Sequence, residues 1–138
     1  MREELNFNEW ESSIGKLILS YAQVEFELMR LYKIWIPDRE YKDETYEERF
    51  KKAIGVAKDR LGSEHSTIEY LIKMKRFLPF RHLVAHNPIP YSNQDDDWYI
   101  FDLKNQKSKI NLNELIKISN DLFFVSLRLC KELRINVR

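Results

Sequence analysis

Hydrophobic side chains recur along this chain with helical spacing. Between residues 8 and 36 they return every three or four positions, which predicts one long amphipathic helix that ends before Pro37. The same spacing predicts a second helix from about Thr45, with Gly62 as its C-terminal stop, and a third helix that opens near Ile68. The apolar positions of the first helix are Ile14, Leu17, Ile18, Tyr21, Val24, Leu28, Leu31 and Tyr32.

Pro79 interrupts the third of these helices. Proline lacks a backbone N–H and clashes with the preceding turn, so the helix should kink or restart there. The restarted segment is expected to run from Phe80 to His86 and to stop at Asn87, since the residue before a proline is pushed out of the helical region.

Residues 89–110 break the helical pattern. They contain three consecutive aspartates at 95–97, followed by an alternating stretch from Trp98 to Leu103, which predicts a short β-hairpin or an irregular flap. A capping box formed by Asn111 and Glu114 then opens a final helix, whose apolar positions continue to Leu133. The acidic stretch from residue 38 to residue 44 is expected to be a loop.

These elements indicate an all-α fold, an antiparallel bundle of four to five helices with a β-hairpin or flap insertion near residues 89–110. A chain of 138 residues has the usual size of one domain, so residues 1–138 are taken as a single helical domain. Three glycines and four prolines beside 43% hydrophobic and 33% charged residues argue against a disordered chain.

Two features bear on the cellular compartment. No apolar run approaches the length of a membrane span, and the N-terminus lacks the apolar region of a secretory signal, so we expect a cytoplasmic protein without a membrane partner. The single cysteine, Cys130, excludes an intramolecular disulfide and a multi-cysteine zinc site. It lies among the leucines of the last helix and is expected to be a buried thiol.

Charge is unevenly distributed along the chain. The net charge is +1, but residues 1–48 hold 6 basic and 12 acidic side chains, whereas residues 49–138 hold 17 basic and 10 acidic ones. Three of the basic residues, Lys73, Lys75 and Arg76, come shortly before residue 81. A phosphate chain could be attracted locally to this part, although solvated helix faces would explain the same charges.

Arg81 and His86 stand five positions apart at the end of the restarted helix. A polar residue, His82, follows the arginine, and a small residue, Ala85, precedes the histidine. This Arg-x4-His pattern, followed by a helix stop at Asn87 in an all-helical chain, resembles the signature of the HEPN family of helical RNA-cleaving domains. A bare arginine and histidine at this spacing also occur by chance in many proteins.

The two residues suit cleavage of RNA by its own 2′-hydroxyl. An imidazole with a pKa of roughly 6.5 can take the hydroxyl proton near neutral pH, which makes His86 the candidate general base. A guanidinium offers a permanent positive charge to the oxygens of the pentacoordinate phosphorus, which makes Arg81 the candidate stabiliser. This route needs no metal or other cofactor. It leaves a 2′,3′-cyclic phosphate and a 5′-hydroxyl, and its substrate must be RNA.

A single copy of the pair looks insufficient, because five positions along an α-helix rotate the side-chain direction by about 140°. HEPN proteins are similar in needing a partner: they typically dimerise through the motif-bearing face, so that two copies of the pair meet in one cleft. The resemblance therefore implies a symmetric homodimer. A second proton carrier would then be the partner's His86.

Three further residues are supporting candidates. The resemblance implies that His82, in the polar position after the arginine, orients the phosphate or the neighbouring histidine. Asn87 either donates a hydrogen bond at the site or terminates the helix. Glu25 resembles an acidic residue that pairs with the motif arginine in many HEPN proteins, although its position on an amphipathic helix fits a solvated side chain equally well.

Three alternatives to a nuclease stay open. His82 and His86 have the i, i+4 spacing of zinc ligands, and the aspartates at 95–97 could supply a carboxylate, but a HExxH glutamate and further cysteines are missing. A noncatalytic dimeric module could bind a partner or RNA bases through exposed aromatic residues at Trp98, Tyr99 and Phe101. In a purely structural role, the arginine would cap carbonyls or pair with an acidic side chain.

In the HEPN family, active enzymes often serve as toxins or in defence against phage, restrained by a cognate antitoxin.

Overall fold

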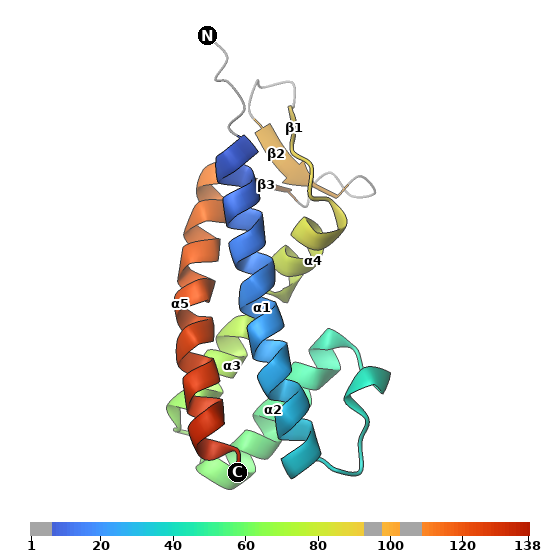
Figure 1. The fold of residues 1–138 in the computed structure, drawn as a ribbon, viewed down its shortest axis with the longest axis vertical. Helices are drawn as coiled ribbons and strands as arrows, with labels where there is room; N and C mark the ends of the chain where they lie inside the picture. The colour runs from blue at the N-terminus through green and yellow to red at the C-terminus, as the bar shows by residue number, and fades with distance from the viewer. Residues whose placement is uncertain (1–6, 93–97, 103–108) are drawn as a thin grey trace.

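Two long helices, α1 (Phe7–Trp35) and α5 (Leu112–Asn136), form the spine of the fold (Figure 1). The structure is a computed structural model and describes residues 7–92, 98–102 and 109–138. Near one end of the spine, the Ser119 hydroxyl donates to the carbonyl of Ser13 at 2.8 Å. Near the other end, Arg134 Nε donates to Glu27 Oε1 at 2.7 Å. The two helices therefore run in the same direction.

The remaining helices pack along this spine. A 3-10 turn at Tyr41–Asp43 precedes α2 (Tyr46–Leu61), and α3 (Ser66–Arg76) packs against both α2 and α5. Both ends of α2 are set by local sequence: the Thr45 side chain accepts a hydrogen bond from Glu48 N, and Gly62 adopts a φ of 92° that favours glycine. The helix starting near Thr45 and stopping at Gly62 is thus confirmed.

The chain breaks between α3 and α4 (Leu78–His86). Phe77 is both the C-cap of α3 and the N-cap of α4. Pro79 lies in the first turn of α4, where its missing N–H costs no helical hydrogen bond. The predicted restart at the proline is confirmed. Because α3 and α4 together carry the chain back along the bundle, α5 starts at the same end as α1 (Figure 1).

Beyond α4 the described residues form a small antiparallel sheet of three strands, β1 (Tyr91–Ser92), β2 (Trp98–Phe101) and β3 (Lys109–Asn111), in the order β1-β2-β3. Ile100 faces Ile110 across β2 and β3, and both side chains are fully buried. An all-α bundle with a short β-hairpin near residues 89–110 is therefore confirmed. One detail of the expected arrangement differs, since α1 and α5 are parallel to each other.

The core lies between α1, α5 and the shorter helices. Burial of each large apolar side chain in it contributes about 1.5–3 kcal/mol to folding. Cys130 is only 4% exposed, as expected for a buried thiol. In the part of the chain that the structure describes, no helix combines the length and the apolar character that a membrane span requires. The largest fully buried side chains are Trp10, Tyr21, Tyr32, Phe50, Leu17, Leu28, Leu31, Leu71, Met74, Leu78, Ile100 and Ile110.

Candidate active site

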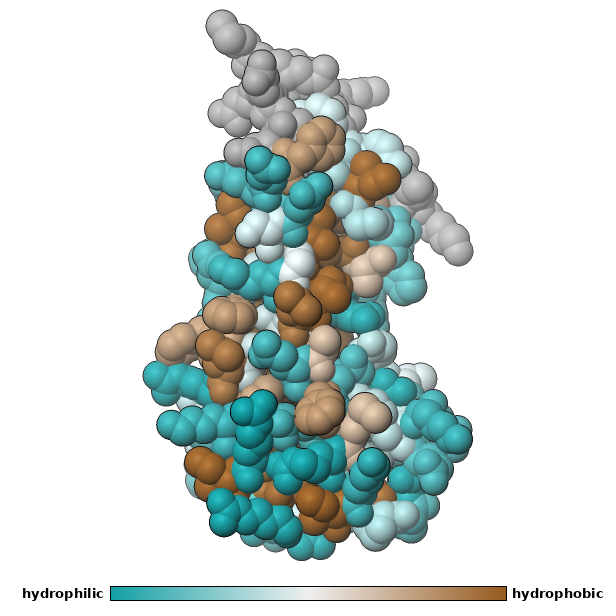
Figure 2. Space-filling model, in the orientation of Figure 1, coloured by the Kyte–Doolittle hydropathy of each residue, from teal (hydrophilic) through white to brown (hydrophobic). Residues whose placement is uncertain are grey.

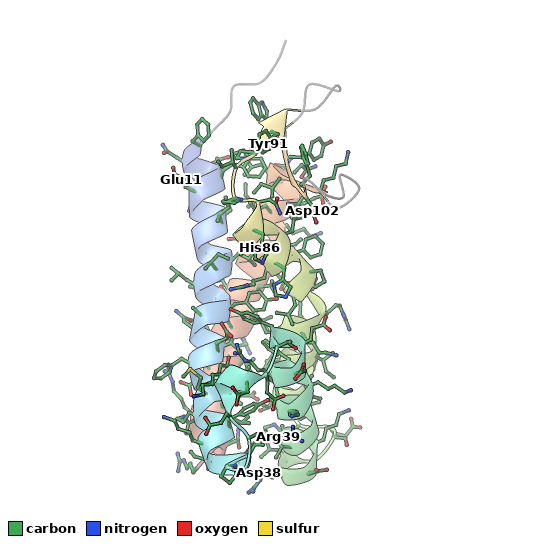
Figure 3. The ribbon with its side chains drawn as sticks, turned by 90° about the vertical axis from the view of Figure 1, so that its right-hand side faces the viewer. Glu11, Asp38, Arg39, His86, Tyr91 and Asp102 are labelled. Atoms are coloured by element: carbon green, nitrogen blue, oxygen red, sulfur yellow. The ribbon has the colours of Figure 1, made fainter. Side chains whose placement is uncertain are left out.

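Helix α4 carries the arginine and both histidines of the motif. Its Leu78 and Val84 are fully buried and fix the helix against the bundle. Just before it, the carbonyl of Met74 accepts a hydrogen bond of 2.7 Å from the hydroxyl of Tyr21 on α1. Figure 3 shows His86 at the end of α4 that adjoins the sheet, below the labelled Tyr91 and Asp102.

Arg81 is held by neutral groups. One terminal nitrogen, Nη2, donates to the Tyr46 hydroxyl at 2.7 Å, and the guanidinium carbon lies 4.2 Å from the centre of the Tyr46 ring. The other, Nη1, lies 3.4 Å from His82 Nδ1. The buried Nε has no hydrogen-bond partner among the described residues. Since each terminal nitrogen carries two N–H groups, one on each stays available to a ligand.

No described carboxylate forms an ion pair with Arg81. Glu25 pairs instead with Arg49, whose Nη1 lies 3.1 Å from Glu25 Oε1, and the Tyr41 hydroxyl donates to the same oxygen at 2.8 Å. Neither the direct pairing of Glu25 with Arg81 nor a fully solvated Glu25 is observed. The reason is that Arg49 of α2 occupies the carboxylate as its ion-pair partner, while Arg81 donates to the Tyr46 hydroxyl.

Tyr46 lies beside both arginines, and Glu25 acts on its hydroxyl. Burial raises the pKa of the Tyr46 hydroxyl, and the Glu25 carboxylate raises it further by charge and by a side-chain hydrogen bond. The positive charges of Arg81 and Arg49 act in the opposite direction on the pKa of Tyr46. The tyrosine therefore stays protonated, accepting from Arg81 and donating towards Glu25.

His82 lies beside Arg81 as a neutral ring. Burial, followed by the charges of Arg81 and His86, lowers the pKa of His82, whereas Glu47 acts to raise it. An arginine only donates hydrogen bonds, so Nδ1 of His82 must be the unprotonated nitrogen in this contact. The proton of the neutral ring is then on Nε2. The ring also packs edge-on against Tyr46, with centroids 5.4 Å apart.

His86 is exposed at the end of the helix, and its ring centroid lies 6.5 Å from that of His82. His82 thus lies near both Arg81 and His86. Asn87, the next residue, is the C-cap: both its backbone N–H and its side-chain Nδ2 lie within hydrogen-bond distance of the Leu83 carbonyl, at 3.0 and 3.2 Å. Helix termination accounts for Asn87, one of the two roles expected for it.

The geometry gives little support to a zinc site or to a binding surface of exposed aromatic residues. Within residues 7–92, 98–102 and 109–138, no group of three or more histidine, cysteine, aspartate or glutamate side chains could hold a metal ion. The aspartates at 95–97 lie outside the described residues. Trp98, Tyr99 and Phe101, whose exposure the interaction-module alternative requires, are half-buried, because β2 is the central strand of the sheet.

Tyr46 and Arg49 are the site residues that sequence reasoning missed. Their partners, Arg81 and Glu25, are 35 and 24 positions away along the chain, and neither pairing produces a local pattern. The only signal was position, since Tyr46 immediately follows the N-cap of α2. The chain matches no family model, no curated protein and no solved structure.

Proposed function

We propose that this protein is a metal-independent endoribonuclease of the HEPN type. The single observation that carries the proposal is the state of Arg81. Its charge is held in place by a tyrosine and a histidine, no described carboxylate neutralises it, and the exposed His86 lies on the same short helix. A purely structural arginine would normally be paired with a carboxylate when it is partly buried.

In this proposal, His86 takes the proton from a ribose 2′-hydroxyl while the 2′-oxygen attacks the adjacent phosphorus. The new bond joins the 2′-oxygen to phosphorus, and the bond from phosphorus to the 5′-oxygen breaks. Arg81 donates its two available N–H groups to the phosphate oxygens, where negative charge accumulates. His82, with its proton on Nε2, orients the same phosphate. The 5′-oxygen leaves with a proton, and the products are a 2′,3′-cyclic phosphate and a 5′-hydroxyl.

A second copy of the chain supplies the proton for the leaving oxygen, as the partner's His86. Exposed apolar side chains on α1 and just after α4 support this part of the proposal. Leu19 and Phe26 on α1 are 62% and 68% exposed, and Ile89, three positions after His86, is 58% exposed. Figure 2 shows hydrophobic patches on the face that α1 occupies in Figure 1. Large exposed apolar side chains of this kind mark interaction surfaces.

The test is cleavage of end-labelled single-stranded RNA in EDTA. Wild-type protein is compared with His86→Ala and with His65→Asn, a control that changes the remaining histidine while keeping an N-cap acceptor for α3. We expect His86→Ala to lower the rate by about 10²- to 10⁴-fold and the control to keep it. Cyclic phosphate ends must be found in the wild-type products. Equal cleavage by all three proteins, or none, would reject the proposal.

A mixing experiment tests the composite site. Arg81→Gln and His86→Ala are each inactive in the proposal, but a heterodimer of the two combines one intact Arg81 with the intact His86 of the other chain. Partial recovery of cleavage on mixing supports a shared cleft. The heterodimer keeps only one of the two His86 side chains that the proposal uses, so recovery is partial at most. A heterodimer that forms, as light scattering shows, but stays inactive would mean that both His86 side chains are needed or that the cleft is not shared.

A double substitution on α1 tests the proposed dimer surface. Leu19→Glu combined with Phe26→Glu is expected to yield monomers without cleavage activity, whereas Phe124→Glu, at a residue of α5 that is 54% exposed, should stay dimeric. Light scattering after size-exclusion chromatography measures the molar mass.

As a cytoplasmic HEPN-type nuclease, the protein would act as a toxin or antiphage effector restrained by a cognate antitoxin. Expression in cells tests this role, which predicts an arrest of growth that requires His86.

A further inference from the structure

A groove lined by basic side chains runs along the contact between α2 and α3. It has a volume of about 450 Å³ and is open to solvent. Ile54 of α2, with Ile72 and Pro79, supplies its apolar surface. Four cationic side chains line it, and Glu47 is its single acidic residue. The cationic residues are Lys51, Lys58, Lys75 and Arg76.

The groove leads to the candidate active site at one end. Glu47 directly follows Tyr46, whose hydroxyl accepts from Arg81, and Pro79 precedes Arg81 by two positions on α4. The charge of Glu47 also acts to raise the pKa of His82. From this end the groove extends past Lys51 to Lys58, a distance of about 16 Å along α2. In Figure 3, α2 and α3 lie below His86.

The four cationic side chains of the groove form no stabilising ion pairs among the described residues. None of the four forms an ion pair with a carboxylate within the described residues, in contrast to Lys52, which lies 2.6 Å from Glu44, and Lys73, which lies 2.8 Å from Asp121. Four unpaired positive charges beside one carboxylate produce a local excess of positive charge on a protein whose net charge is only +1. Such an excess attracts a polyanion.

We propose that this groove binds the phosphate backbone of a single RNA strand and leads it to Arg81 and His86. The proposal rests on the proposed function and adds the course of the substrate. Lysine and arginine supply contacts to phosphates, while the isoleucines contact sugars. No aromatic side chain lines the groove, so it offers no stacking platform for bases. Binding in the groove is therefore independent of base sequence.

Binding is measured separately from cleavage, with a fluorescent 2′-O-methyl RNA of about 12 nucleotides, which lacks the nucleophile and stays intact. Anisotropy titrations at several salt concentrations compare wild-type protein with Lys58→Gln combined with Lys75→Gln. The matched control is Lys117→Gln combined with Lys131→Gln on α5, where both lysines are exposed. Thermal unfolding of each variant verifies that it is folded.

We expect the groove variant to bind more weakly and to lose about 1.4 from the slope of log affinity against log salt, at about 0.7 for each lost phosphate contact. The control should match the wild type. Equal affinities of the groove variant and the wild type, or equal losses in both variants, would overturn the proposal. Tighter binding of a duplex of the same sequence would overturn the assignment to a single strand.

Failure of the groove and failure of the nuclease can be told apart. If the wild type binds the uncleavable strand through the groove but no RNA is cut, the groove proposal stands and the proposed function fails. If RNA is cut but the groove variant keeps the wild-type KM for a long strand, only the groove proposal fails. Where both hold, the groove variant raises KM for a long strand and cleaves a dinucleotide at the wild-type rate.

Discussion

Arg81 donates to the hydroxyl of Tyr46 at 2.7 Å and lies 4.2 Å above the centre of the same ring. This contact joins the first turn of α2 to α4 and fixes a positive charge without neutralising it. A carboxylate at the position of the Tyr46 hydroxyl would hold the arginine equally well but would reduce its attraction for a phosphate. The Glu25 carboxylate, whose charge raises the pKa of Tyr46, is balanced by Arg49.

Substituting Tyr46→Phe tests whether the hydroxyl positions Arg81. The ring is kept, and the arginine loses one acceptor, so we expect kcat for RNA cleavage to fall roughly tenfold with an unchanged KM. The unfolding midpoint should drop by less than about 5 °C. Tyr70→Phe, at a half-buried tyrosine of α3, serves as the control.

A double-mutant cycle separates positioning from a structural role. If Tyr46 acts through Arg81, then Tyr46→Phe has no further effect on cleavage in an Arg81→Gln background. Additive losses would show that the hydroxyl acts independently of the arginine. Arg81→Gln is preferable to a charge reversal here, since a new carboxylate at position 81 would approach Glu25 through Tyr46.

The pKa of His82 predicts how stability depends on pH. Burial, then Arg81 and His86, lower this pKa below the unfolded value of about 6.5, so the fold disfavours the protonated ring. The stabilisation is complete above that value and is lost as the pH falls through the folded-state pKa. In His82→Gln, we therefore expect the unfolding midpoint to decline less between pH 7 and pH 5 than in the wild type.

Thermal unfolding at several pH values measures the effect. Lys117→Gln, at an exposed side chain of α5, is the control, and its pH profile should follow that of the wild type. Parallel profiles for wild type and His82→Gln would contradict the lowered pKa of His82.

Local signals predicted the elements well. Thr45 and Gly62 bound α2, Pro79 opens α4, and the side chain of Asn111 caps α5 by accepting from Glu114 N, because each of these effects depends on residues within a few positions. The direction of α5 relative to α1 depends on how α3 and α4 cross the bundle, and no local pattern contains that information.

The candidate site, like the fold, was predictable from local sequence only in part. The motif placed Arg81, His82 and His86 on one short helix, but what surrounds them comes from α1 and α2. Glu25 pairs with Arg49, 24 positions away along the chain, a long-range outcome that helical periodicity does not encode. The basic groove is similar, since two of its three lysines lie on α2 and the third lies on α3.

Glu27 is a buried carboxylate whose loss should destabilise the fold. It is 2% exposed and lies 3.1 Å from Arg30 Nε and 2.7 Å from Arg134 Nε. Arg30 in turn donates to the carbonyls of Leu133 and Val137 at the end of α5. Glu27→Gln weakens both pairs, and we expect the free energy of unfolding to fall by about 1–3 kcal/mol.

Urea denaturation provides the measurement. The midpoint should decrease while the m-value stays constant, since the surface exposed on unfolding is unchanged. Glu64→Gln, in the exposed turn before α3, is expected to leave the midpoint in place. A Glu27→Gln midpoint equal to that of the wild type would mean that the network contributes nothing net to stability.

The same carboxylate affects Cys130. Burial, and then the charge of Glu27, raise the pKa of the Cys130 thiol to about 11 against an unperturbed value of 9.0, with Arg134 acting in the opposite direction. Because the thiolate is the reactive form, ionisation alone should slow alkylation of the folded protein at pH 8 about a hundredfold relative to the urea-unfolded chain. Iodoacetamide labelling followed by mass spectrometry measures both rates. Equal rates would contradict a raised pKa. Faster labelling of Glu27→Gln that exceeds the increase expected from its lower free energy of unfolding would identify the carboxylate as part of its cause.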